Sequence, residues 1–375
     1  MELIATCKIG LESTVAFQLH KLGILDTETL DARVKFRGMF DTMAKALLWL
    51  RTGERVLLTV GTFRADTFDA LFEQTKALPW HQFLRPNTRI HVNGKSAKST
   101  LFSVSDCQSI VKKAIVESLK AAYRINTVPE TGEEVIVEVG ILRDEVTVAL
   151  DCCGAGLSRR GYRTYNVAAP LSETLGAGLI LLSRFFPDAP LIDPMCGSGT
   201  IPIEAAMIAN NIAPSGNRSF AAEQWRFLDA KVFRQAREEA ADVERHEKLQ
   251  ILGSDIDPRC IDLCKKHAKK AGVMAEWCVR PVKELKTAWQ RGVLITNPPY
   301  GERLMNAGEV KSLYREMRTV FDRLPDWQIN IITSMKGFES VYGKTADRRR
   351  KLSNGGMPCT LYQFYAQRPP REPQA

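Results

Sequence analysis

Three short polar motifs in the second half of the chain each follow an apolar run. DPMCGSGT begins at Asp193, SDID holds Asp255 and Asp257, and NPPYG begins at Asn297. The carboxyl ends of parallel strands lie at one edge of a doubly wound sheet, and ligands of such sheets bind there. The spacing therefore predicts a single binding site to which three strand ends contribute.

The first motif is a glycine-rich turn between a strand and the helix TIPIEAAMIA. Gly197 and Gly199 allow a ligand to approach the backbone, and the start of the helix offers unpaired N–H groups. No Lys-Ser or Lys-Thr pair follows, which excludes a Walker A loop, and the pattern is not GxGxxG, which makes a dinucleotide a poor fit. Asp255, at the end of the next strand, is placed to accept hydrogen bonds from two ribose hydroxyls.

The NPPY motif points to chemistry on an amino group. Two prolines cannot lie within a central strand, so they form a stiff turn that leaves the carbonyl of Pro298 free. With the side-chain oxygen of Asn297, this carbonyl provides two acceptors for one exocyclic NH₂, and Tyr300 can stack on the attached ring. Acceptors that draw the hydrogens of such an amine localise its lone pair and help it attack a sulfonium methyl group.

The elements that must carry these motifs follow Arg163. Strands alternate with helices over LIDPMCGSGT, ILGSDIDP, GVLITNPPYG and WQINIIT, after an apolar helix at residues 170–186. This alternation predicts an α/β fold with a doubly wound, mostly parallel sheet. We expect the polar, helix-prone stretch 214–250 to be an elaboration of that domain, and the RRRKLSNGG segment at 348–356 to be a solvated loop.

The first 160 residues follow a different pattern. Strand and helix signals alternate up to residue 60, and a small α+β module follows them. In that module a strand at Arg89–Val92 precedes the loop NGKSAKST, and a helix over SDCQSIVKKAIVESLKAAYR comes next. The clearest hairpin is EEVIVEVGILRDEVTVALD, where apolar residues alternate on both sides of Arg143 and Asp144.

Composition restricts the class of protein. The chain has 375 residues, 45% hydrophobic and 25% charged, with a net charge of +9. No apolar run reaches the roughly 18 residues of a membrane span, and no secretory signal is visible, so we expect a cytoplasmic protein without membrane contact. The basic charge fits either a solvated surface or a nucleic-acid partner. The 9 cysteines form no CxxC pair, and no metal site is predicted.

Together the motifs resemble the class I S-adenosylmethionine-dependent methyltransferases that act on amino groups of bases. RGYRTYNVAAPLSETLGAGLI before DPMCGSGT, and NPPYGERL after it, further resemble the THUMP-domain RNA guanine-N2 methyltransferases, above all the bacterial enzymes that modify large-subunit ribosomal RNA. The similarity covers nearly the whole chain, including the PSGNRSFAAEQW insertion. It implies a ferredoxin-like α+β module at 1–60, a THUMP-like RNA-binding module at 61–160 and a methyltransferase domain at 161–370.

The resemblance also implies roles for individual residues, with S-adenosylmethionine as cofactor, no metal, and large-subunit ribosomal RNA as partner. An acid that many relatives use for the adenine amine is replaced here by VRPVKE, so the adenine contact stays unassigned. Cys196 occupies a position that needs only a small residue, and we do not expect it to be a nucleophile. The expected target-amine site is Asn297, Pro298, Pro299 and Tyr300. The expected cofactor site is Ala169, Pro170, Leu171, Asp193, Cys196, Gly197, Ser198, Gly199, Asp255, Asp257 and Asn297, with Asp255 preferred to Asp257 for the ribose.

Basic residues outside these motifs are candidates for phosphate contacts. Three alternatives to guanine-N2 methylation of 23S ribosomal RNA remain: a transfer RNA guanine-N2 enzyme, an adenine-N6 DNA methyltransferase, and a non-catalytic RNA-binding factor that retains the fold. The sequence leaves the oligomeric state open. The expected RNA contacts are Lys95, Lys98, Lys112, Lys113, Arg159, Arg160 and Arg163.

Overall fold

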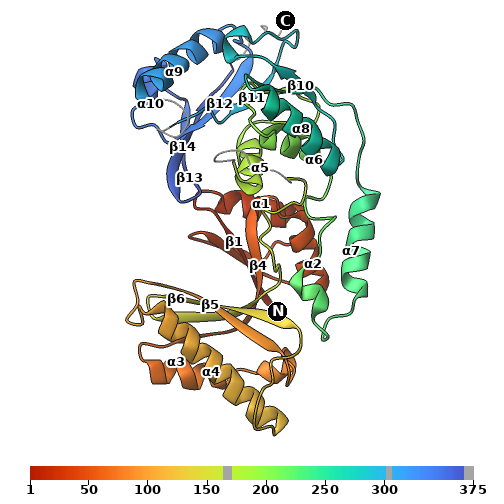
Figure 1. Ribbon diagram of the computed structural model, residues 1–375, viewed down its shortest axis with the longest axis vertical. Coiled ribbons are helices and arrows are strands. Elements are labelled where there is room, and N and C mark those ends of the chain that lie inside the picture. The colour runs from red at the N-terminus through yellow and green to blue at the C-terminus, as the bar shows by residue number, and fades with distance from the viewer. Residues whose placement is uncertain (164–170, 301–305, 367–375) are drawn as a thin grey trace, which may run out of the picture.

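The computed structural model describes residues 1–163, 171–300 and 306–366, so the predicted cofactor residues Ala169 and Pro170 lie outside the described part. The described chain forms two sheets of seven strands each. Figure 1 shows that the first N-terminal elements lie in the middle of the molecule, between the expected THUMP-like module and the sheet of the C-terminal half. No described helix is long and apolar enough to cross a membrane.

The first sheet has the strand order β2-β3-β1-β4-β7-β6-β5. Its neighbouring strands are antiparallel except for β5 and β6. The strands are β1 (Glu2–Cys7), β2 (Thr27–Leu30), β3 (Arg33–Arg37), β4 (Gly53–Arg64), β5 (Arg89–Ala97), β6 (Glu134–Leu142) and β7 (Glu145–Asp151). The helices are α1 (Glu12–Lys21), α2 (Phe40–Trp49), α3 (Phe68–Lys76) and α4 (Val104–Tyr123).

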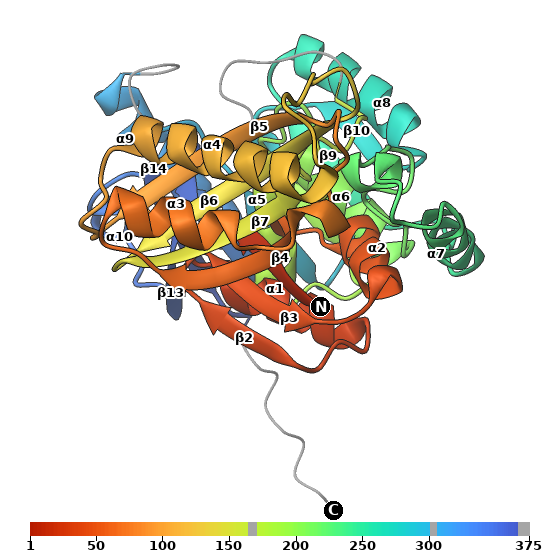
Figure 2. The same ribbon diagram turned by 90° about the horizontal axis from the view of Figure 1, so that it is seen from below.

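One long strand joins the two N-terminal modules. β4 pairs with β1 through its first half and with β7 along most of its length, so both modules share a continuous sheet. The expected division between residues 60 and 61 falls inside this strand and stays a prediction. Figure 2 shows α3 and α4 lying side by side across one face of this sheet, over β5, β6 and β7.

The predicted hairpin is present as β6 and β7, and both Arg143 and Asp144 at its turn have positive φ, as a tight two-residue turn requires. The strand before α4 is longer than expected. β5 continues to Ala97 because its backbone pairs with β6 as far as Leu142. Lys95 therefore lies on a strand, not in a loop.

The second sheet has the order β10-β9-β8-β11-β12-β14-β13, in which β10 to β12 are parallel and β14 is antiparallel to its neighbours. The strands are β8 (Leu191–Asp193), β9 (Ile251–Asp255), β10 (Glu276–Val279), β11 (Gly292–Thr296), β12 (Trp327–Thr333), β13 (Arg348–Asn354) and β14 (Met357–Phe364). The helices are α5 (Glu173–Leu182), α6 (Thr200–Ala209), α7 (Lys231–Asp242), α8 (Pro258–Ala271), α9 (Ala307–Phe321) and α10 (Phe338–Tyr342).

The predicted doubly wound α/β sheet is confirmed by this order. From β8 the chain adds β9 and β10 on one side, and it then returns to add β11 and β12 on the other side. Doubly wound sheets bind ligands at this switch point, here between β8 and β11. The expectation for residues 348–356 is wrong in one respect. Arg348–Asn354 form the edge strand β13, because their backbone pairs with β14 along its whole length. Only the two glycines that follow, both with positive φ, make a turn.

Candidate active site

The glycine-rich turn after β8 has the geometry of a cofactor loop. Gly197 and Gly199 both have positive φ, at 51° and 85°. A Cβ atom at Gly199 would lie only 3.0 Å from Cys264 Sγ and from the ring of Trp277. Both the backbone conformation and the close packing therefore require glycine at this position.

Side chains from β9 and α8 hold this loop in place. Asp255 Oδ2 accepts a hydrogen bond from the Gly197 N–H (2.9 Å), and its Oδ1 accepts one from the Asp257 N–H (3.0 Å). His267 Nδ1 donates to the Ser198 carbonyl at 3.1 Å. Asp255 therefore joins the ends of β8 and β9. His267, which is fully buried, supports the loop from behind and was not expected from the sequence.

The two acids of SDID differ in their surroundings. Asp257 begins α8, where its Oδ1 accepts from the Arg259 N–H at 2.9 Å and its carboxyl pairs with the Arg259 guanidinium. These hydrogen bonds from Arg259 lower the pKa of Asp257. The Asp257 carboxyl thus starts α8, whereas the Asp255 carboxyl joins β9 to the glycine-rich turn; both acids line the cavity, and the preference for Asp255 stays a prediction.

Asp193 is a buried carboxyl at the end of β8. Its Oδ1 accepts from the Met195 N–H at 3.2 Å. Burial raises the pKa of Asp193 to about 7. The Asp193 carboxyl, which lies next to the glycine-rich turn, therefore changes between its protonated and ionised forms near neutral pH.

Cys196 lies on the same loop, and its thiol faces another thiol. Its Sγ is 3.7 Å from Cys264 Sγ. This hydrogen bond and burial raise the pKa of Cys196, which opposes formation of the nucleophilic thiolate. Among the described residues, no three His, Cys, Asp or Glu side chains form a group that could hold a metal ion.

The NPPY turn follows β11 and is fixed from two other elements. The hydroxyl of Tyr314, on α9, donates to the Pro299 carbonyl at 3.3 Å. Tyr300 Oη accepts from Asn354 Nδ2 at 2.9 Å, and burial raises the pKa of Tyr300 to about 12. Asn297 Oδ1 is buried and finds no donor among the described residues. A buried acceptor without a donor is costly, and this one points to a ligand that supplies the donor.

A cavity of about 1060 Å³ brings the three strand ends together. This volume is at or above the range of roughly 300–1,000 Å³ that small-molecule sites occupy. Gly199 does not line it and lies behind the loop at the start of α6. The predicted residues in its wall are Leu171, Asp193, Cys196, Gly197, Ser198, Asp255, Asp257, Asn297, Pro298, Pro299 and Tyr300.

Several residues of the wall were not expected from the sequence. Ile256 lies between two acids after β9, lines the cavity and is 71% exposed. Some of the others come from elements whose position depends on the sheet order, so no local pattern marks them: Pro281, Val282 and Lys283 after β10, Leu313 and Glu316 on α9, and Asn354, Gly355 and Met357 at the tip of the β13–β14 hairpin. The rest are neighbours of the predicted residues: Pro194, Met195, Thr200 and Ile201 around the glycine-rich turn, and Arg259, Cys260 and Leu263 on α8.

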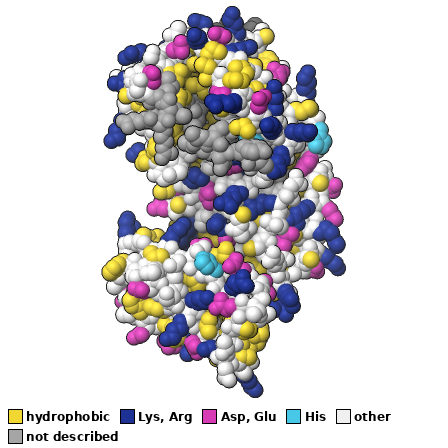
Figure 3. Space-filling model, in the orientation of Figure 1, with side chains coloured by type: hydrophobic (Ala, Val, Ile, Leu, Met, Phe, Trp, Pro, Cys, Tyr) yellow, Lys and Arg dark blue, Asp and Glu magenta, His cyan; other side chains and the backbone are white. Residues whose placement is uncertain are grey.

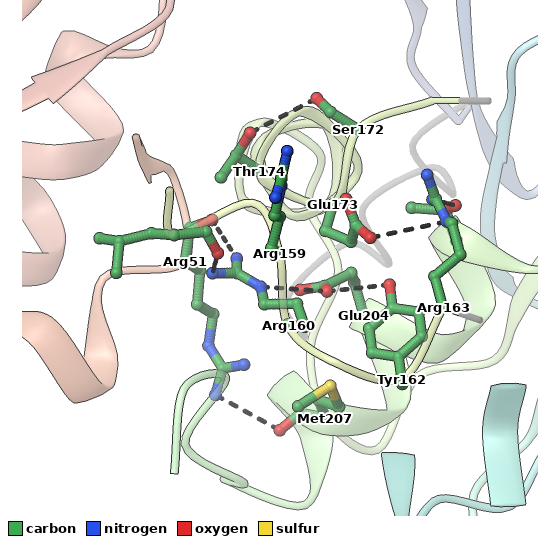
Figure 4. Close-up of polar contacts among 12 residues, drawn as sticks. Arg51, Arg159, Arg160, Tyr162, Arg163, Ser172, Glu173, Thr174, Glu204 and Met207 are labelled. Atoms are coloured by element: carbon green, nitrogen blue, oxygen red, sulfur yellow. Dashed lines mark hydrogen bonds and ion pairs between the residues drawn. The ribbon is translucent and has the colours of Figure 1, made fainter. Parts of the chain in front are cut away.

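The expected RNA contacts at Arg160 and Arg163 are corrected by the structure (Figure 4). The side chain of Arg160 is only 1% exposed; its Nε lies 3.4 Å from Glu204 Oε1 and its NH2 group donates to the Arg51 carbonyl. Arg163 donates to Thr200 Oγ1 at 2.6 Å and to the Leu171 carbonyl at 2.8 Å. Arg163 Nε also lies 3.5 Å from Glu173 Oε1, so each of the two arginines pairs with a carboxylate of the protein, Arg160 with Glu204 and Arg163 with Glu173.

The junction around Arg160 also includes a second buried arginine. Arg51 NH2 donates to the Ile212 carbonyl at 2.7 Å, and burial lowers the pKa of Arg51 to about 10. Tyr162 donates to Glu204 Oε1 at 3.2 Å. Arg51 NH2 also lies 3.4 Å from the Met207 carbonyl, so the N-terminal module contacts α6, the helix that starts at the glycine-rich turn, and the segment that follows it.

The other expected RNA contacts remain on the surface. Lys112 differs from the rest, because its ammonium lies 2.9 Å from Glu130. Figure 3 shows one face of the molecule, over which Lys and Arg side chains are spread and interspersed with Asp and Glu, without forming a single patch. The exposed candidates are Lys95, Lys98, Lys113 and Arg159.

Comparison with known proteins agrees with this architecture. Residues 160–363 match the RMKL-like methyltransferase domain, residues 2–57 the RlmL ferredoxin-like domain, and residues 65–151 the THUMP domain. A Bacillus subtilis protein named "Putative RNA methyltransferase YpsC" is 42% identical over 99% of this chain and 97% of its own length. The ribosomal RNA large subunit methyltransferase K/L of Syntrophotalea carbinolica is 32% identical over 97% of this chain, which spans only 53% of that relative.

Two solved structures are similar over almost the whole chain. The structure of SMU.472 complexed with SAH has a TM-score of 0.93 and 41% identity, and covers 98% of both chains. A Listeria monocytogenes protein described as "a predicted N6-adenine-specific DNA methylase" has a TM-score of 0.92 and 46% identity, over 98% of this chain and 96% of its own. The bound SAH of the first, the methyltransferase domain and the cavity at the strand ends agree on the cofactor. The chain belongs to the S-adenosylmethionine-dependent RNA methyltransferases of the RlmK/L type, with ferredoxin-like, THUMP and RMKL-like methyltransferase domains.

Proposed function

We propose that this protein transfers a methyl group from S-adenosylmethionine to the exocyclic N2 amine of a guanine in 23S ribosomal RNA. The observation that carries the proposal is the side chain of Asn297, whose Oδ1 is buried and faces no donor among the described residues. Asn297, Pro298 and Tyr300 line the same cavity as the cofactor loop. An aromatic amine would supply the missing donor while its ring lies on Tyr300.

The residues around the loop suit the proposed cofactor. Gly197, Ser198, Asp255 and Ile256 line the cavity. The backbone of Gly197 and Ser198 would hold the methionine part, Asp255 would accept hydrogen bonds from the ribose hydroxyls, and Ile256 would offer an apolar surface to the adenine ring. Leu171 lies in the wall, at the expected methionine end. When bound, S-adenosylmethionine supplies an electrophilic methyl group on a sulfonium. The chain's own part is to hold this methyl in line with the amine.

Asn297 and the Pro298 carbonyl would accept the two hydrogens of the amine and localise its nitrogen lone pair. The stiff proline pair keeps these acceptors in place before the substrate arrives, which is how preorganised polar groups lower a barrier. As the amine nitrogen takes the methyl group and the C–S bond breaks, the nitrogen would carry the positive charge that the sulfonium loses, and its extra proton would then leave to water. No general base is needed for that step.

The substrate class rests on the N-terminal modules. The THUMP match at residues 65–151 and the K/L relatives support RNA, and ribosomal RNA in particular, as the partner in the cytoplasm. Of the seven expected RNA contacts, Lys95, Lys98, Lys113 and Arg159 are exposed and so accessible to phosphates.

The test is transfer of labelled methyl groups to unmodified 23S ribosomal RNA, followed by digestion to nucleosides. We expect the label in N2-methylguanosine. Label in any other nucleoside overturns the proposed amine, and label in transfer RNA but not ribosomal RNA overturns the proposed substrate. Variants of Asp193 or Asn297 that remain fully functional would favour a non-catalytic factor.

A second candidate is methylation of adenine N6 in DNA. The NPPY acceptors fit either amine, and one similar solved structure carries that description. Duplex DNA added in the same assay distinguishes the two functions. Under the RNA proposal, the DNA acquires no label and competes only through its phosphates.

A further inference from the structure

We propose that Asn354, at the tip of the β13–β14 hairpin, is a positioning residue for the target base and acts through Tyr300. This inference rests on the proposed function, because it assigns a role to the wall of the same cavity. Asn354 Nδ2 donates to Tyr300 Oη at 2.9 Å. This contact joins two parts of the chain that are 54 residues apart in sequence.

The hairpin reaches the NPPY turn from across the sheet. Tyr300 follows β11, while β13 and β14 lie beyond β12 in the strand order. Asn354 pairs with Met357 in the last register position, and Gly355 and Gly356 between them have φ of 57° and 84°. Only glycine adopts these values without strain, so the turn fixes where Asn354 is presented.

The NPPY turn is thereby held at two adjacent residues. The Tyr314 hydroxyl holds the Pro299 carbonyl at 3.3 Å, and Asn354 holds the hydroxyl of Tyr300. Cys359 Sγ, one strand away, lies 3.9 Å from the same hydroxyl. The Tyr300 hydroxyl lies on the axis of the χ2 torsion, so a hydrogen bond to it limits χ1 and the position of the ring's far end. The position of the ring on which a base stacks is therefore restricted before the base arrives.

The hairpin tip also lines the cavity itself. Asn354, Gly355 and Met357 are in its wall, together with Tyr300. Met357 is 43% exposed, although it is a large apolar residue. An exposed thioether beside an oriented aromatic ring is an adaptable apolar surface for the edge of a flat base. The hairpin is thus placed to contact the substrate, whereas the cofactor loop lies at the ends of β8 and β9.

The experiment compares steady-state and single-turnover methyl transfer for four variants of the full chain. Asn354→Leu keeps the side-chain size but removes the hydrogen bond, and Asn354→Asp keeps it because the Tyr300 hydroxyl can donate to the carboxylate. Tyr300→Phe removes the partner, and Ser353→Ala is the neighbouring control. The affinity for SAH and the thermal unfolding of each variant are measured alongside.

We expect Asn354→Leu to lower kcat roughly tenfold, the size of one lost hydrogen bond that acts in the transition state. Asn354→Asp should keep most of the rate, and SAH affinity should stay within about twofold for all variants. In the Tyr300→Phe background, Asn354→Leu should have no further effect, because the two residues act as one unit.

Three results would overturn the positioning role: full activity of Asn354→Leu, the same tenfold loss in the Tyr300→Phe background, or a loss of SAH affinity. If Asn354→Leu does not fold, Asn354→Asp, which keeps the hydrogen bond, is compared with Tyr300→Phe, which removes it. Equal losses of methyl transfer in these two variants would overturn the positioning role. Total methyl transfer is the readout, whichever nucleoside is modified. A wild-type protein that methylates another base therefore refutes the proposed function without affecting this test.

Discussion

The domain junction and the cavity are both rich in buried polar groups, but these groups face different partners. At the junction, Arg160 and Glu204 are opposite charges 3.4 Å apart, and Tyr162 adds a hydrogen bond to the same carboxyl. In the cavity, Asn297 Oδ1 faces no donor among the described residues, and the carboxyl of Asp193 has a pKa near 7. The junction holds a closed pair of opposite charges, although Glu204 Oε2 and Arg51 NH1 also lack partners among the described residues. Asn297 and Asp193, by contrast, belong to the wall of a cavity that is large enough for a ligand.

The same distinction separates neighbouring residues. Arg159 and Arg160 follow each other in the chain, yet one is exposed and the other is buried at the junction. Neither composition nor spacing distinguishes Arg159 from Arg160 in the sequence. Burial and partners, which depend on how the domains meet, decide between a surface charge and a structural one.

The largest effect is expected from this pair. Replacing Arg160 with Ala leaves Glu204 buried without its partner and should lower the free energy of unfolding by about 3–5 kcal/mol. Arg159→Ala should change it by less than about 0.5 kcal/mol, as surface substitutions do. Urea unfolding of both variants measures the difference. Equal stabilities would show that the junction does not depend on the buried charge.

Asn297→Ala should separate catalysis from cofactor binding. Losing one preorganised polar group at a reacting centre costs roughly 10²–10³ in kcat, about 3–4 kcal/mol. Because Asp255 and the glycine loop are unchanged, SAH affinity should fall by no more than a few-fold. Single-turnover transfer and calorimetry with SAH measure the two quantities. A variant that binds SAH poorly would place Asn297 in the cofactor site alone.

Because the pKa of Asp193 is raised, we expect cofactor binding to depend on pH. Its pKa is raised from 3.8 to about 7, so the free protein holds the proton below pH 7, and the charged cofactor favours the ionised form. Affinity for the cofactor should therefore rise as the pH increases through 7, by roughly tenfold between pH 6 and pH 8. The unliganded protein should show the opposite trend, because its stability falls as the pH rises from about 4 to 7. Titrations with Asp193→Asn as control should show neither dependence.

The smallest effects are expected from the exposed basic residues. Each of Lys95, Lys98, Lys113 and Arg159 that contacts a phosphate should, when replaced by Ala, reduce the salt dependence of log K for RNA by about 0.7–0.9. Methyl transfer at saturating RNA should be unchanged. Filter binding at several salt concentrations measures the slope. If the salt dependence of log K is unchanged in all four variants, RNA binds to another face of the protein.

The sequence was informative where local chemistry decides the structure. The glycines at 197 and 199, the acid at 255 and the proline pair were found because each has a steric or electronic reason to be where it is. The edge strand β13 and the length of β5 were missed, because pairing with a neighbouring strand overrides polar composition. Asn354 could not be found, since its contact with Tyr300 depends on which strands lie side by side.

The proposed function requires that Asn297 and the Pro298 carbonyl receive the amine of a guanine. A structure of the protein with SAH and the RNA fragment that it methylates would show where that amine lies. We expect the guanine N2 atom within hydrogen-bonding distance of both oxygens, with the ring stacked on Tyr300. A base whose amine points away from these acceptors, or an adenine in that position, would contradict it.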